Sequence, residues 1–111
     1  MLNIAKDADG TQAVITLIRD GLRRTCGRRL VRSVLYGSRA RGDARPDSDF
    51  DVVVFLRDYR GLWAESRPLG RLAVEIFDRT GAVVNFLPAH ADDYHRRTGF
   101  MHQVRSEGLA V

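Results

Sequence analysis

Apolar positions along the chain recur at two spacings, one typical of helices and one typical of buried strands. Between residues 11 and 27 they recur every three or four positions, which predicts a helix with one buried face. The members of this face are Val14, Leu17, Ile18, Leu22 and Cys26. Asp9-Gly10-Thr11 provides a start for the helix. Two continuous apolar runs, Val31–Tyr36 and Phe50–Leu56, predict strands that are buried within a sheet.

Residues 58–80 return to the helical spacing and predict a second long helix. We expect its inner side to consist of Leu62, Trp63, Leu69, Leu72, Ala73, Ile76 and Phe77. Trp63 has an alternative role, because an indole beside a bound nucleotide would stack on its base. We expect Pro68 to interrupt or restart the helix, since proline lacks the N–H that continues the hydrogen-bond pattern. Gly81 is expected to end it.

The last part of the chain predicts a third strand and two short helices. The strand covers residues 82–87, and we expect Pro88 to end it. The helices cover residues 91–97 and 100–106. Helices and strands therefore alternate along a single domain, residues 1–111, which is too short for a second core. The predicted fold is of the α/β (α+β) class, with a small mixed sheet of about three main strands flanked by helices.

One segment combines a phosphate-binding turn with two carboxylates. Gly37 and Ser38 follow the first predicted strand, and glycine tolerates both a sharp turn and the close approach of a phosphate. A helix is expected to begin there, so that free N–H groups and the Ser38 hydroxyl can bind the phosphate. Arg39 and Arg41 would add positive charge. The turn thus predicts a site for ATP or another nucleoside triphosphate.

The two carboxylates stand on either side of Phe50, at the start of the second predicted strand. Alternation along a strand places Asp49 and Asp51 on the same face. Carboxylates so placed bind hard cations such as Mg²⁺, which share their remaining positions with substrate phosphates. The alternative is a purely structural network of Asp–Arg ion pairs, because the preceding loop carries Arg39, Arg41 and Arg45.

Gly37-Ser38, ten residues and Asp49-Phe50-Asp51, with Ala40, Gly42 and Ser48 in their places, resemble the signature of the DNA polymerase β-like nucleotidyltransferase superfamily. The small size is similar to its minimal nucleotidyltransferase (MNT) branch, many members of which are antitoxins paired with HEPN-domain toxins. The resemblance implies a nucleotidyltransferase fold and Mg²⁺-dependent transfer of a nucleotidyl group to a hydroxyl, with release of pyrophosphate. The donor is expected to be ATP, which would supply AMP, or another nucleoside triphosphate. The resemblance assigns catalysis and metal binding to Asp49 and Asp51, and nucleotide binding to Gly37, Ser38, Arg39 and Arg41.

The third carboxylate of that superfamily is the point at which the sequence departs from the pattern. A later strand of catalytic members carries a further acidic metal ligand, and the equivalent position here is Asn85. An amide oxygen can ligate Mg²⁺, but it is neutral and cannot act as a general base. Weak activity is therefore expected. Glu75 and Asp78 are the nearest acids upstream, and both fall on the predicted helix as solvated positions.

Three functional hypotheses follow from the resemblance. The first is an enzyme that modifies a hydroxyl. A domain this small has little room for an acceptor pocket of its own, so another polypeptide is expected to present the hydroxyl, and the resemblance implies a tyrosine of a HEPN toxin. The second is a non-catalytic antitoxin that neutralises its toxin by binding, which Asn85 favours. The third is an antibiotic-modifying nucleotidyltransferase, which normally requires a larger chain or a dimer. A homo-oligomer or a hetero-oligomer is compatible with each of these three hypotheses.

Composition narrows the classes of partner. Lys6 is the only lysine among 18 basic residues, which leaves 17 arginines and a formal net charge of +4. The arginines at positions 23, 24, 28, 29 and 32 predict either an acidic partner or a solvated helix end, and the lack of interleaved aromatics argues against direct nucleic-acid binding. The single Cys26 and the spacing of the histidines exclude a disulfide framework and a zinc site. Without a leader or an apolar span, a cytoplasmic protein is expected.

Overall fold

A four-stranded mixed sheet forms the centre of the computed structural model, which describes residues 10–111. Strands β1 (Leu30–Tyr36) and β2 (Phe50–Leu56) run antiparallel to each other. β3 (Val84–His90) lies parallel to β2 at one edge, and β4 (Leu109–Ala110) lies antiparallel to β1 at the other. The predicted fold class is confirmed. The short β4 was not predicted, because two residues acquire strand conformation only from their pairing with β1.

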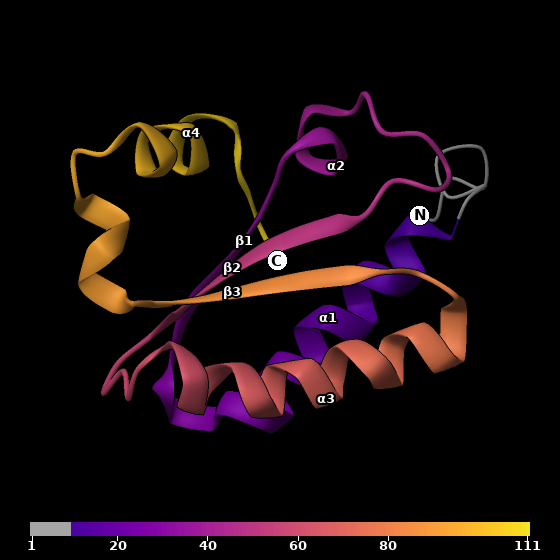
Figure 1. Cartoon of the computed structure of the whole chain (residues 1–111). Helices are drawn as coiled ribbons and strands as arrows, with labels where there is room; N and C mark the ends of the chain where they lie inside the picture. Colours follow the sequence, from indigo (N-terminus) through magenta and orange to yellow (C-terminus); the bar gives the residue numbers. More distant parts are fainter. Residues whose placement is uncertain (1–9) are drawn as a thin grey trace.

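Helices cover both faces of the sheet. The long helices α1 (Thr11–Cys26) and α3 (Leu62–Thr80) lie side by side on one face (Figure 1). The short α2 (Ser38–Arg41) and α4 (Gly99–Glu107) lie on the other face, and α4 contacts the 3₁₀ helix η2 (Ala91–His95). A second 3₁₀ turn, η1 (Gly27–Arg29), links α1 to β1. No helix within residues 10–111 has the length and apolar composition needed to cross a membrane.

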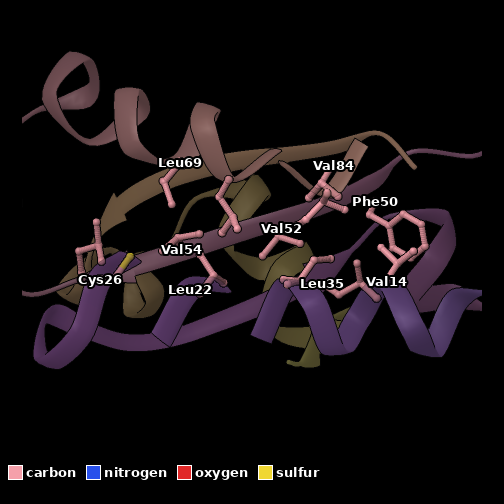
Figure 2. Packing of buried hydrophobic residues seen from close by; sticks show 13 residues of the cluster. Val14, Leu22, Cys26, Leu35, Phe50, Val52, Val54, Leu69 and Val84 are labelled. Carbon is pink, nitrogen blue, oxygen red and sulfur yellow. The ribbon is translucent and has the colours of Figure 1, made fainter. Parts of the chain in front are cut away.

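Alternation along β2 divides the buried residues into two clusters. Phe50, Val52 and Val54 face α1 and α3, where they pack with residues such as Val14 and Leu22 (Figure 2). The cluster on the other side is smaller, and its buried members are Val34, Val53, Phe55, Ala89, Met101 and Val104. Because successive side chains of a strand point to opposite faces, Asp51 shares the face of the smaller cluster.

The expected inner side of α3 is partly wrong. Its buried residues are Glu65, Leu69, Leu72 and Ile76, which recur at steps of four, three and four. Trp63 is 80% exposed and Phe77 is 52% exposed, so neither side chain belongs to the core. Leu62 is also exposed. The apolar pattern could not choose between the two sides because each side of this helix carries apolar residues.

The two prolines expected to break elements do not break them. α3 continues through Pro68, which removes one backbone hydrogen bond, while burial of Leu69 and Leu72 holds the helix to the sheet. β3 includes Pro88, which pairs with Val54 of β2. An edge strand tolerates proline because only one of its sides has a hydrogen-bonding partner. Tertiary packing overrides the local signal at both positions.

A buried ion pair closes the end of the sheet at which β1 begins. Glu65, only 3% exposed, accepts a hydrogen bond from the Arg29 guanidinium and another from the Arg60 N–H at 2.9 Å. Arg29 also donates to the Asp58 carbonyl at 3.1 Å. Burial alone would raise the pKa of Glu65, but these hydrogen bonds outweigh it and lower the pKa below 4.5. The carboxylate is therefore a structural anion that fixes the start of α3.

We expect Glu65→Gln to lower the free energy of unfolding by about 3 kcal/mol, because the substitution leaves the Arg29 charge largely buried without its counter-ion. Since the pKa of Glu65 is lowered on folding, its contribution is present above the unfolded value and is lost as the pH falls below about 4.5. Urea denaturation at several pH values measures both effects. The matched control is Glu75→Gln, whose exposed pair with Arg24 should contribute less than about 1 kcal/mol. Equal losses for the two variants would contradict the assignment.

Candidate active site

Three strands have a terminus at the same end of the sheet, and this brings the predicted polar residues together. β1 finishes at this end of the sheet, whereas β2 and β3 begin there. The register pairs Tyr36 with Asp51 across β1 and β2, and Asp51 with Asn85 across β2 and β3. Paired residues point to the same face of a sheet. The three side chains therefore form a row on the face that carries α2 and α4.

Asn85 joins the two carboxylates through its side-chain amide. Its Nδ2 donates to Asp49 Oδ2 at 3.1 Å and to Asp51 Oδ1 at 3.0 Å. Asp49 is exposed and Asp51 is half-buried, so solvent and ligands can reach the pair. Asn85 thus lies beside both acidic residues, where the resemblance to the superfamily would place its third carboxylate. Its neutral amide lets the two negative charges lie close together in the absence of a cation.

Gly37 brings the turn after β1 against this pair. Its φ of 76° and ψ of −155° belong to a region that only glycine occupies without strain. A Cβ atom built on Gly37 would lie 3.2 Å from Asp51 Oδ2, closer than ordinary van der Waals contact. α2 starts at the next residue, so the half-buried Ser38 directly follows the glycine that lies against Asp51. The structure therefore brings five predicted site residues to the same end of the sheet: Gly37, Ser38, Asp49, Asp51 and Asn85.

The two arginines that follow Ser38 are engaged with the protein. Arg39 donates to the Ser48 carbonyl at 2.9 Å and the Pro46 carbonyl at 3.1 Å, and its guanidinium lies 4.2 Å from the centroid of the Phe50 ring. These contacts fix the loop that leads into Asp49. Arg41 pairs at the surface with Asp43 at 3.3 Å. Its other pairing is with Glu107 at 3.5 Å.

Neither site carboxylate forms an ion pair with any residue in the part of the chain that the structure describes. Within residues 10–111, the alternative network that would pair Asp49 and Asp51 with Arg39, Arg41 or Arg45 is therefore not formed. Two carboxylates and an amide supply oxygen atoms, the ligands that Mg²⁺ prefers. Residues 10–111 contain no cluster of three or more His, Cys, Asp or Glu side chains, so Asn85 is the third potential ligand by position. The donor set fits a hard divalent cation.

Tyr36 is a member of the site that our sequence reasoning missed. It is half-buried, and its ring packs edge-to-face on Phe100 with centroids 5.4 Å apart. Burial and the negative charge of Asp51 raise the pKa of its phenol, so the hydroxyl stays protonated and can donate a hydrogen bond. The available signal was the alternation of β1, which places Tyr36 two residues beyond Val34 on the same face.

A cavity of about 280 Å³ lies near the same end of the sheet but on its opposite face, which carries α1 and α3. Phe50, Val14 and Val83 contribute to its lining. Because Phe50 and Asp51 are successive residues of a strand, their side chains point to opposite faces. The Asp51 carboxylate therefore faces the side of α2 and α4, and this cavity lies on the other face of the sheet.

A comparison with protein families finds one that matches most of this sequence. A family model described as the nucleotidyltransferase domain matches residues 17–104, a range that includes the turn, both carboxylates and Asn85. The chain belongs to this family. The resemblance to nucleotidyltransferases inferred from Gly37-Ser38 and Asp49-Phe50-Asp51 is thereby confirmed. No curated protein sequence matches the chain significantly.

Solved structures confirm the nucleotidyltransferase fold. A toxin–antitoxin crystallised with AMP-PNP is 22% identical with a TM-score of 0.64, over 86% of this chain and 69% of the other. The toxin–antitoxin MntA-HpeT is 19% identical with a TM-score of 0.59, over 89% and 69%. A protein assigned as a minimal nucleotidyltransferase is 23% identical with a TM-score of 0.57, over 99% and 97%. At these identities the likeness establishes the fold alone.

Proposed function

We propose that this nucleotidyltransferase domain is an antitoxin that uses Mg²⁺ and ATP to transfer AMP to a hydroxyl of a partner toxin. The observation that carries the proposal is the pair of carboxylates held by Asn85 against Gly37, in a chain that belongs to the nucleotidyltransferase domain family. The toxin partner is supported by two similar structures, which are toxin–antitoxin pairs. A HEPN-domain toxin with a tyrosine acceptor is the partner that the sequence resemblance implies.

Each site residue has a defined task in this proposal. Asp49 and Asp51 hold the Mg²⁺, which neutralises charge on the triphosphate and on the departing pyrophosphate. Gly37 leaves room for a phosphate beside Asp51, and the Ser38 hydroxyl donates a hydrogen bond to it. Arg39 positions the loop that carries Asp49. These residues bind and orient the donor, so they act before any bond is broken.

Arg41 adds positive charge to the triphosphate after leaving its surface partners. Its pairs with Asp43 and Glu107 are exposed, so solvent and salt screen them and they hold the side chain only weakly. Binding of a phosphate group therefore outweighs their loss. The Tyr36 hydroxyl lies in the same row as Asp51 and Asn85, where it helps to orient the acceptor or the donor.

Asn85 limits the rate of transfer. To ligate a cation, the side chain must turn so that Oδ1 replaces the Nδ2 that now donates to both carboxylates. It still cannot accept a proton from the acceptor hydroxyl. A non-catalytic antitoxin that acts by binding is the second candidate, and this neutral residue is the observation that favours it.

We expect Asn85→Asp to raise the rate of AMP transfer by about 10²-fold, because a carboxylate restores both an anionic ligand and a general base. The variant should also gain thermal stability on addition of Mg²⁺, since three carboxylates would otherwise repel one another. Mass spectrometry of the toxin after incubation with Mg-ATP measures the transfer, and Asp49→Asn is the inactive control. Toxin that binds tightly but is never modified, by the parent or by Asn85→Asp, would establish the binding-only antitoxin instead.

A further inference from the structure

The outward side of α3 carries exposed apolar side chains that the fold does not use. Trp63 is 80% exposed, Val74 is 60% exposed and Phe77 is 52% exposed. Together with Arg67 and Gly70 they recur at alternate steps of four and three residues, the spacing of the contact line in a coiled coil. We call these five residues, Trp63, Arg67, Gly70, Val74 and Phe77, the outer seam.

No described element covers the outer seam. α3 lies in the outermost layer with α1 beside it, and its buried side is occupied by Leu69, Leu72 and Ile76 (Figure 1). Several large apolar side chains aligned on one exposed helix mark an interface with another protein, and Trp is a residue type enriched at the centres of such interfaces. The heptad spacing indicates that the contacting element is itself a helix.

We propose that the outer seam is a homodimer interface, in which α3 packs antiparallel against α3 of a second copy of this chain. The proposal does not depend on the activity assigned above. Its first argument is shape. Antiparallel packing places each Val74 over the Gly70 of the other copy, where a Cβ built on glycine has no atom within 4 Å. A large residue thus faces a small one at this layer, and the same register places Arg67 beside the Phe77 of the other copy.

The second argument is charge. Arg67 and Arg71 lie in the first half of the helix, whereas Glu75 and Asp78 lie in the second half. In an antiparallel pair the first half of one helix faces the second half of the other, so Arg67 lies next to Asp78. Within residues 10–111, Arg67 and Asp78 form no ion pair, whereas Glu75 is paired with Arg24 at 3.1 Å. Both charges therefore remain for an intermolecular pair.

This charge order favours a second copy over other occupants. A parallel pair would bring the arginines of the two copies together, and like charges at close range weaken association. A nucleic acid would meet Glu75 and Asp78 as well as the arginines, and carboxylates repel its phosphates. Among pairings of two α3 helices, the antiparallel arrangement brings Arg67 and Arg71 of each copy toward Glu75 and Asp78 of the other.

Sedimentation of the purified chain over a range of concentrations tests the proposal. We expect a dimer for the parent and an increase of at least about 100-fold in the dissociation constant for Val74→Glu, which places a charge in the centre of the seam. The matched control is Leu109→Glu, at a residue that is 51% exposed on β4 at the far edge of the sheet, and it should dimerise like the parent. An unchanged circular-dichroism spectrum of Val74→Glu would show that the variant is folded.

A charge exchange gives the decisive result. Arg67→Asp and Asp78→Arg should each weaken the dimer, and the double variant should recover most of the affinity, because it reverses the intermolecular pair without removing it. If the single variants lost affinity only because they misfolded, the double variant would not recover the affinity of the dimer. A monomeric parent at all concentrations, or a double variant no better than the single ones, would overturn the proposal. Loss of toxin binding by Val74→Glu from a monomeric parent would assign the seam to the toxin instead.

Discussion

Replacing Asp49 and Asp51 together by asparagine is expected to abolish Mg²⁺-dependent binding of ATP and to lower the transfer rate by about 10³-fold or more, a loss of about 4 kcal/mol of transition-state stabilisation. The two carboxylates are the only acidic groups that Asn85 joins in the described structure. Asparagine at both positions retains the oxygen atoms that accept from Asn85, so the fold should remain intact. Isothermal calorimetry with Mg-ATP and mass spectrometry of the toxin measure the two effects.

Asp47→Asn is the matched control for this double variant. Asp47 is exposed in the same loop, two residues before Asp49, and lines the cavity on the other side of β2. Its replacement removes one negative charge from the loop without touching the carboxylate pair, so binding should change little. If the double variant bound Mg-ATP as tightly as the parent, the metal site would be misassigned. An equal loss in Asp47→Asn would indicate a general charge effect.

Replacing Gly37 by valine is expected to combine two losses at one residue. The backbone conformation at φ 76° and ψ −155° costs about 1–3 kcal/mol for any residue with a Cβ, which should appear as lower stability. The Cβ would also lie 3.2 Å from Asp51 Oδ2, in the space proposed for a phosphate, and should weaken ATP binding by at least about tenfold beyond the effect of Ser38→Ala. Thermal melting and calorimetry separate the two losses.

Gly42→Val separates backbone strain from contact with the site. Gly42 also has a positive φ, 84°, but a Cβ built on it has no atom within 4 Å. This variant should lose stability and keep its affinity for Mg-ATP. Normal binding by a folded Gly37→Val would show that the turn is structural and that the phosphate lies elsewhere. Equal losses of affinity in both variants would point to strain in α2 as the cause.

Much of the site was predictable because strand alternation and turn chemistry act over short stretches of chain. Gly37 takes the positive φ that a sharp turn after a strand requires, and Asp49 and Asp51 lie close enough to share one amide. The family resemblance placed Asn85 on a strand beside the two carboxylates, and the structure pairs it with Asp51. The sequence motif alone predicted the family match over residues 17–104.

The direction of long and amphipathic side chains was decided by the tertiary structure. Arg39 was expected at the triphosphate, yet its planar guanidinium finds carbonyl acceptors at Pro46 and Ser48 and the ring of Phe50. Those groups meet only after the loop has folded back. Trp63 and Phe77 were expected in the core, but the sheet offers α3 one side only, and Leu69, Leu72 and Ile76 fill it.

Local sequence patterns were sufficient to predict the three longer strands, the turn and the chemical groups of the site, since each depends on neighbours two to four residues away. Only the tertiary structure decided that Glu65 is a buried anion paired with Arg29, that Tyr36 joins the site, and that two residues near the C-terminus form a fourth strand. Each of these outcomes depends on a partner more than ten residues away along the chain. Local periodicity carries no information about such partners, because burial and pairing across the sheet arise when the whole chain packs.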